Sequence, residues 1–150
     1  MTNVRTSEPR TYNVQSDNVQ TIERYGVIAV IRRENFYLTI RRSETVAAPN
    51  KICFPGGGIE KGETDTEALI RECREEINVA VKPIKQIWQN VTAWNVHLTW
   101  WEASMDEDAK PIANPREVSE IIWLTREEML EHPDLLSSNV EFVERILTCL

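Results

Sequence analysis

The alternation of apolar and polar positions predicts short strands in the first third of the chain. Gly26–Ile31 is a short apolar run rich in branched residues, which is typical of a buried strand. Asn35 then marks a turn, and Phe36–Ile40 is predicted to be the hairpin partner of this strand. Ile52–Phe54 is a brief third strand, and the proline and three glycines after it predict that the chain turns there.

The next segment has the periodicity of an amphipathic helix. Apolar residues recur at helical spacing over Thr64–Ile77 and predict one broad stripe, made of Ala68, Leu69, Ile70, Cys73 and Ile77. Thr64 followed by Glu67 has the spacing of a capping box at the helix N-terminus. Asn78 stands where a residue in the left-handed conformation would end the helix.

The second half of the chain predicts further strands and helices. The expected strands are Val79–Val91 with an interruption at Pro83, Val96–Ala103 and Ser119–Leu124. A short helix with capping-box spacing opens at Thr125, and a last helix is expected over Ser138–Leu147, after Pro133. Strands and helices mix without strict alternation, which favours an α+β fold with helices layered on a mixed sheet.

The composition fits one domain of ordinary size. The chain has 150 residues, of which 41% are hydrophobic and 27% charged, so a core is available. Residues 1–22 are polar and unpatterned and predict a loose arm, while residues 23–150 predict a single domain. The arm lacks the apolar core of a signal peptide, and no apolar run approaches the roughly 18 residues that span a membrane. We therefore expect a cytoplasmic protein without a membrane segment, whose three cysteines stay reduced.

The charge balance limits the class of partner. A net charge of −7 repels a phosphate backbone, so an extended nucleic-acid surface is not expected. Small phosphorylated ligands remain compatible with this charge if a metal cation screens the site.

The glycine-rich segment and the acidic helix after it carry the candidate chemistry. Glu75 and Glu76 follow Glu72 by three and four positions, so the three carboxylates share one ridge of the predicted helix. Each like-charged pair would cost roughly a few tenths of a kcal/mol in an isolated helix. A solvated acidic face is one interpretation, and a hard divalent cation such as Mg²⁺, which prefers oxygen ligands, is the other.

This segment resembles the Nudix box, written G-x5-E-x7-R-E-U-x-E-E-x-G-U with U apolar. The matching residues are Gly57, Glu63, Arg71, Glu72, Cys73, Glu75, Glu76 and Val79. The one departure is Asn78, where the family has glycine, and Asn is the residue that best tolerates the left-handed conformation after glycine. The order of the surrounding elements is also similar to the family. The resemblance therefore implies a Nudix-type α/β/α sandwich with a mixed β-sheet.

The resemblance also implies roles for the residues of the box. Three glutamates and one backbone carbonyl are expected to bind Mg²⁺ or Mn²⁺, namely Glu72, Glu75, Glu76 and Gly56. Glu63 and Arg71 are expected to tie the glycine turn to the helix. The general base is left open between Glu72 and a glutamate outside the box, for which Glu117 and Glu120 are the candidates.

Candidate substrate contacts lie outside the box. Arg41 or Arg42 suits a phosphate, and strand alternation allows only one of them to face the site. Three tryptophans are candidates for stacking on a base, namely Trp94, Trp100 and Trp101. Two further aromatic residues, Trp123 and Phe36, are expected in the core, and Tyr37 is expected on the surface.

The function implied by the resemblance is Mg²⁺-dependent hydrolysis of a diphosphate bond in a nucleoside diphosphate linked to another group. The short chain favours a nucleoside triphosphate, normal or oxidised, cut to a monophosphate and pyrophosphate. The alternatives are a nucleotide sugar or dinucleotide substrate, a nucleotide-binding module without catalysis, and an isomerase that uses Cys53. The intact box favours a hydrolase. Because relatives often form dimers, a homodimer is also an expectation.

Overall fold

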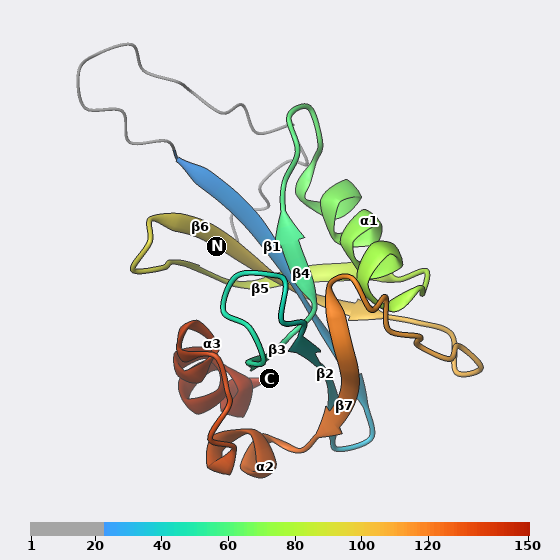
Figure 1. Cartoon of the computed structure of the whole chain (residues 1–150), viewed down its shortest axis with the longest axis vertical. Coiled ribbons are helices and arrows are strands. Elements are labelled where there is room, and N and C mark those ends of the chain that lie inside the picture. Colours follow the sequence, from blue (N-terminus) through green and yellow to red (C-terminus); the bar gives the residue numbers. More distant parts are fainter. Residues whose placement is uncertain (1–22) are drawn as a thin grey trace.

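The apolar run that predicts a buried strand is the centre of a mixed sheet (Figure 1). The computed structural model describes residues 23–150, so the arm expected at residues 1–22 lies outside the described residues. β1 (Arg24–Arg33) pairs antiparallel with β2 (Phe36–Arg42) and with β4 (Gly56–Gly58). On its other edge β1 pairs in parallel with β6 (Val96–Ser104), which makes the sheet mixed.

The remaining strands extend this sheet on both sides. β3 (Ile52–Cys53) and β7 (Val118–Leu124) both pair antiparallel with β2. β5 (Lys82–Val91) pairs antiparallel with β6 and forms the opposite edge. The helices are α1 (Asp65–Ile77), α2 (Arg126–Glu131) and α3 (Ser137–Glu141), and α3 continues as a π-helical turn and a 3₁₀ turn to Cys149.

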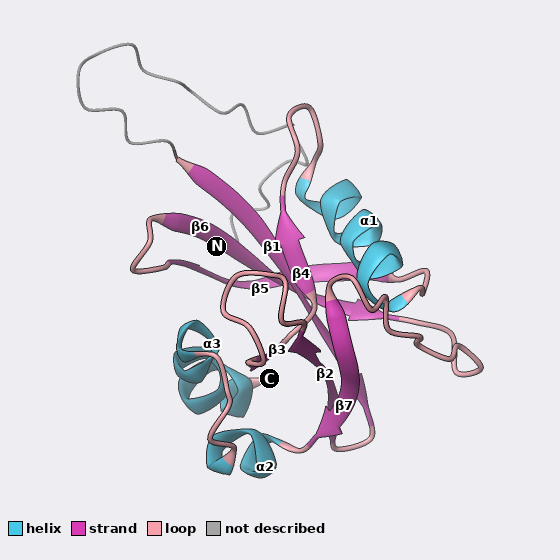
Figure 2. Ribbon diagram, viewed as in Figure 1, coloured by secondary structure: helices cyan, strands magenta, loops and turns pink. Residues whose placement is uncertain are grey.

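Alternate residues of β1 explain the three layers. Val27, Ala29 and Ile31 point to one face and pack in the same buried cluster as the apolar side of α1. Val30 points to the other face and packs with residues of α2 and of the turns after α3. Figure 2 shows α1 on one side of the sheet and the C-terminal helices on the other. The sheet is covered on both faces, and the expected α/β/α sandwich is confirmed.

Local sequence signals determine both ends of α1. The Thr64 side chain accepts a hydrogen bond from the backbone N–H of Glu67, 3.1 Å away. Asn78 ends the helix in the left-handed conformation, with φ 55 and ψ 40, as predicted for the position that departs from the box. The expected apolar stripe is buried except for Ile70, which is 37% exposed and lies outside the sheet contact.

Two predictions about the sheet were wrong. The three glycines form β4 instead of a turn, because a side chain at Gly56 would collide with the carbonyl oxygen of Val27 and only glycine lets the two backbones pair so closely. The strand expected from Val79 begins only at Lys82, and Pro83 lies inside it, where the pairing with β6 shifts register between Pro83 and Lys85 without ending the strand. β5 pairs with β6 alone and is an edge strand. A missing backbone N–H is tolerated at such an edge.

No helix within residues 23–150 combines the length and the apolar character that crossing a bilayer requires.

Candidate active site

Three carboxylates converge between α1 and the start of β7. Oxygen atoms of Glu72, Glu75 and Glu117 all lie within 4.8 Å of one another. Glu72 and Glu75 are adjacent on the α1 ridge, and Glu117 directly precedes β7. Oxygen atoms at this mutual distance suit a small hard cation, which would relieve their repulsion. The carboxylate cluster therefore combines two residues of α1 with a third that lies 42 positions beyond Glu75 in the chain.

Glu76 lies beside this cluster but points to the glycine strand. Its side chain is 5% exposed and accepts a hydrogen bond of 2.7 Å from the backbone N–H of Gly56. Burial, with repulsion from Glu72 and Glu117, raises the pKa of Glu76 to about 8. Burial also raises the pKa of Glu72 to about 7, although the Arg71 guanidinium opposes this shift. Both carboxyls therefore bind protons unusually tightly without a cation.

This proton affinity predicts that the metal-free protein loses stability as pH rises. The folded protein holds a proton on Glu76 between its unperturbed pKa of 4.5 and about 8, whereas the unfolded chain has already released it. We expect a loss on the order of 3 kcal/mol in the free energy of unfolding between about pH 5 and about pH 9. Urea unfolding in EDTA measures it, with Glu76→Gln as the matched variant. Stability that stays level or increases over this range contradicts the prediction. Glu76→Gln should make the loss smaller, leaving the part that comes from the raised pKa of Glu72.

Arg71 links the glycine strand to the acidic ridge. Its guanidinium donates to the Glu63 carboxylate at 2.8 and 2.9 Å, to Glu72 at 2.8 Å and to Glu75 at 3.2 Å. A further bond of 2.8 Å reaches the carbonyl of Gly58 in β4. The Arg71 guanidinium also lowers the pKa of Glu63. Glu63 and Arg71 thus lie together between β4 and α1, as the resemblance to the Nudix box implies.

Gly57 allows β4 to lie directly against the ridge. A side chain at this position would overlap the carboxylate of Glu72. Because Gly57 has no side chain, the backbone of β4 can lie close to the carboxylate of Glu72.

The structure separates the two neighbouring arginines of β2. Arg42 lies on the face of the sheet that α1 covers, because its Nη1 is 4.0 Å from the Sγ of Cys53, which packs in the same buried cluster as α1. Its Nε donates to the carbonyl of Ala47 at 2.6 Å. Arg41 instead donates to Glu120 at 3.1 Å. Glu120 is therefore paired away from the cluster, and of the two glutamates proposed outside the box only Glu117 joins it.

The candidate aromatic contacts also divide. Trp100 is fully buried and stacks on Phe142 with ring centroids 4.3 Å apart, so its choice as a substrate contact was wrong. It lies on the strand face that the C-terminal helices cover, which a single strand pattern does not reveal. Trp101 is half-buried, and its indole N–H donates to Thr99. Trp94 is 72% exposed in the turn between β5 and β6 and remains a candidate.

A cavity of about 1050 Å³ lies beside Trp94, and we call it the loop cavity. One wall is the 47–51 loop, from which Ala47, Ala48, Pro49 and Lys51 contribute, and a second wall is the 135–137 segment before and at the start of α3. The carbonyl of Ala47 in the first wall accepts a hydrogen bond from Arg42. No sequence pattern indicated the 135–137 wall.

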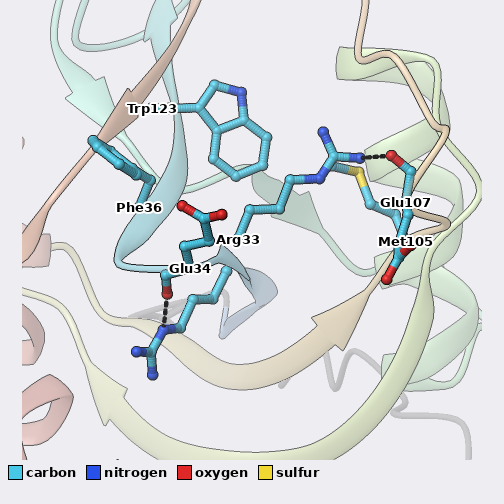
Figure 3. Close-up of a pocket in the computed structure, with 7 residues that line it drawn as sticks. Arg33, Glu34, Phe36, Met105, Glu107 and Trp123 are labelled. Carbon is cyan, nitrogen blue, oxygen red and sulfur yellow. Dashed lines mark hydrogen bonds between the residues drawn. The ribbon is translucent and has the colours of Figure 1, made fainter.

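A second cavity, of about 780 Å³, lies at the other end of β7 from Glu117 (Figure 3). Trp123 lines it, is half-buried and packs against the core cluster on the side of α1, so it lies at the edge of the core in which it was expected. The Arg33 guanidinium lies 5.3 Å from the centre of the Trp123 ring and donates to backbone carbonyls of the loop after β6. Phe36 is 41% exposed in this cavity while Tyr37 is buried, the reverse of the expectation, because the face with Tyr37 is the one that the C-terminal helices cover.

Cys53 does not have the environment of a reactive thiol. It is 4% exposed, and burial raises its pKa to about 11. The thiolate, which is the nucleophile, is therefore disfavoured at neutral pH.

Comparisons with known proteins agree with this arrangement. A family model described as a NUDIX domain matches residues 22–146. The chain therefore belongs to the Nudix family of hydrolases, and the family and fold class expected from the sequence are confirmed.

Individual relatives cover most of the chain. A Nudix hydrolase of Deinococcus radiodurans is 32% identical over 130 residues, which cover 78% of this chain and 72% of the relative. A CTP pyrophosphohydrolase of Escherichia coli K12 is 25% identical over 124 residues, which cover 81% of this chain and 89% of the relative. The crystal structure of a MutT protein from Methanosarcina mazei Go1 matches with a TM-score of 0.72 and 25% identity, over 84% of this chain and 94% of that one.

Proposed function

We propose that this protein hydrolyses a nucleoside triphosphate to a nucleoside monophosphate and pyrophosphate in a Mg²⁺-dependent reaction. The observation that carries the proposal is the convergence of Glu72, Glu75 and Glu117 within 4.8 Å. These three carboxylates, with the carbonyl of Gly56 as a further candidate, are the residues that would hold Mg²⁺ or Mn²⁺. A bound divalent cation would lower the pKa of the attacking water and neutralise phosphate charge.

The protein side chains around the cluster support the same chemistry. Arg42 lies beside Cys53 on the face of the sheet that α1 covers, and its guanidinium would bind a phosphate of the substrate. Glu72 and Glu117 are the two candidates to accept the proton of the attacking water. Arg71 and Glu76 would hold the ridge and β4 in register, through the bonds to Gly58 and Gly56.

The loop cavity supports a nucleoside as the group that is recognised. Its lining is mostly apolar, and the exposed Trp94 ring offers a surface for a base. The carbonyl of Ala47 in this lining accepts a hydrogen bond from Arg42, the proposed phosphate contact. The similarity to a CTP pyrophosphohydrolase over most of both chains supports a triphosphate over a nucleotide sugar or a dinucleotide.

A turnover assay tests this proposal. The purified protein with Mg²⁺ is incubated with ATP, GTP, CTP, UTP, 8-oxo-dGTP, ADP-ribose and UDP-glucose. Phosphate, pyrophosphate and the nucleoside monophosphate are measured separately, because cleavage of ADP-ribose or UDP-glucose releases a monophosphate and a sugar phosphate only. We expect pyrophosphate from at least one triphosphate, and no product in EDTA. Turnover of ADP-ribose or UDP-glucose alone would contradict the triphosphate assignment. Saturable nucleotide binding without any product would contradict catalysis and favour a nucleotide-binding module.

A further inference from the structure

Arg41 joins three segments of the chain that meet beside the loop cavity. Its Nε donates to the Glu120 carboxylate of β7 at 3.1 Å. Its Nη1 donates both to the carbonyl of Asn50 at 2.9 Å and to the Asp134 carboxylate at 3.0 Å. Hydrogen bonds to Asp134 and Glu120 raise the pKa of Arg41, so the guanidinium keeps its charge.

Two of these partners belong to, or directly precede, the two walls of the loop cavity. Asn50 lies within the 47–51 loop, and Asp134 directly precedes the 135–137 wall. One nitrogen atom of Arg41 therefore bridges both walls, while the bond from Nε to Glu120 fixes the guanidinium to the sheet.

The 47–51 loop depends on such contacts for its shape. Ala48 and Asn50 both have left-handed backbone conformations, with φ of 48 and 63. This conformation is unfavourable for a residue with a Cβ, so surrounding contacts have to maintain it. Backbone bonds between Arg42 and residues Asn50 and Lys51 hold the end of the loop to β2. Arg41 donates to Asn50 of the loop and to Asp134, and so connects the loop to the second wall as well.

The second wall, residues 135–137, is attached to β3, which pairs with β2. The backbone N–H of Ile52 donates to the carbonyl of Asp134 at 2.9 Å, and the N–H of Leu136 donates to the carbonyl of Ile52 at 2.8 Å. These bonds hold the 135–137 wall against β3. Arg41 also donates to the side chain of Asp134 and so connects this wall to the 47–51 loop.

We propose that Arg41 is a positioning residue that sets the spacing of the two cavity walls and thereby the affinity and selectivity for the nucleoside. It acts through Asn50 and Asp134 and does not bind the phosphates, a role that the geometry leaves to Arg42. Lysine keeps the charge but cannot reproduce the planar fork, whose two nitrogens donate in different directions. The proposal rests on the loop cavity being the nucleoside site of the proposed function.

The test compares Arg41→Lys, Asp134→Asn and the wild type. Arg145→Lys is the matched control. Arg145 has an exposed ion pair with Glu141, four residues earlier in the chain, and it lines neither cavity. We expect Arg41→Lys to raise KM for the best triphosphate by about tenfold, because a small misplacement of binding groups weakens recognition, while kcat changes by less than about threefold. Asp134→Asn, which keeps the bonds to Asn50 and Glu120, should change KM in the same direction by a smaller factor.

Further readouts separate positioning from a general loss of structure. The differences in kcat/KM among ATP, GTP, CTP and UTP should become smaller in Arg41→Lys. The Mn²⁺ affinity, measured by electron paramagnetic resonance, should equal that of the wild type. A fall in kcat at unchanged KM for all four substrates overturns the proposal, as does an Arg41→Lys enzyme that matches Arg145→Lys.

Binding measurements keep this proposal distinct from the proposed function. If the wild type hydrolyses no nucleotide, calorimetry with AMP, GMP, CMP and UMP replaces KM. Weaker binding of the preferred monophosphate to Arg41→Lys then supports the positioning role although the catalytic proposal has failed. Binding that is equal in both proteins, or absent from the wild type, overturns the positioning role.

Discussion

Replacing Glu72 by glutamine is expected to lower kcat by about 10³-fold or more, because it removes a charge from the centre of the carboxylate cluster. Glutamine keeps the shape of the side chain and its contact with Arg71, so the loss reports charge and not packing. The same change removes a carboxyl that is unfavourable to ionise in the metal-free protein. The variant should therefore be folded and at least as stable as the wild type without metal at about pH 9.

The measurement is steady-state turnover at saturating Mg²⁺, with circular dichroism and Mn²⁺ binding on the same samples. Glu102→Gln is the control, since Glu102 is an exposed glutamate of β6 whose Lys85 partner is 4.0 Å away. Activity of Glu72→Gln within tenfold of the wild type would contradict the assignment of Glu72 to the site. Glu117→Gln, measured in parallel, tests the residue that only the tertiary structure brings to the cluster.

The second large effect is expected from Gly57→Ala, which should lower kcat/KM by about 100-fold. The new methyl group would occupy the position of the Glu72 carboxylate, so either this side chain rotates out of the cluster or β4 separates from α1. Both changes disturb the position of the metal-binding oxygens relative to Gly56 and Arg71.

Gly58→Ala is the matched control for this effect. Gly58 is the next residue of β4, and a methyl group there meets only the carbonyl of Tyr25, 4.0 Å away. Turnover and Mn²⁺ affinity are compared for both variants. Equal activity of Gly57→Ala and Gly58→Ala would show that contact between Gly57 and Glu72 does not matter for the reaction.

Local patterns were sufficient for the elements that carry the site. The hydroxyl of Thr64 and the left-handed Asn78 limit α1 to the helix that its apolar stripe predicts. The spacing of the box glutamates then places them on one ridge, because residues three and four apart on a helix are neighbours whatever the rest of the fold. The pairing of Glu63 with Arg71 followed from the resemblance to the Nudix box and also lies within this short stretch of chain.

The sequence by itself therefore determined the family, the helix with its acidic ridge and the alternation that leaves one of two adjacent arginines for the site. Only the tertiary structure decided that Arg42 lies beside Cys53 on the side of α1 while Arg41 pairs with Glu120. It also decided that Glu117 and not Glu120 joins the cluster, and that Trp100 is covered. Each of these outcomes depends on which face of a strand meets a helix or a distant loop. A strand pattern repeats every two residues and gives both faces equally, so contacts between remote segments have to choose between them.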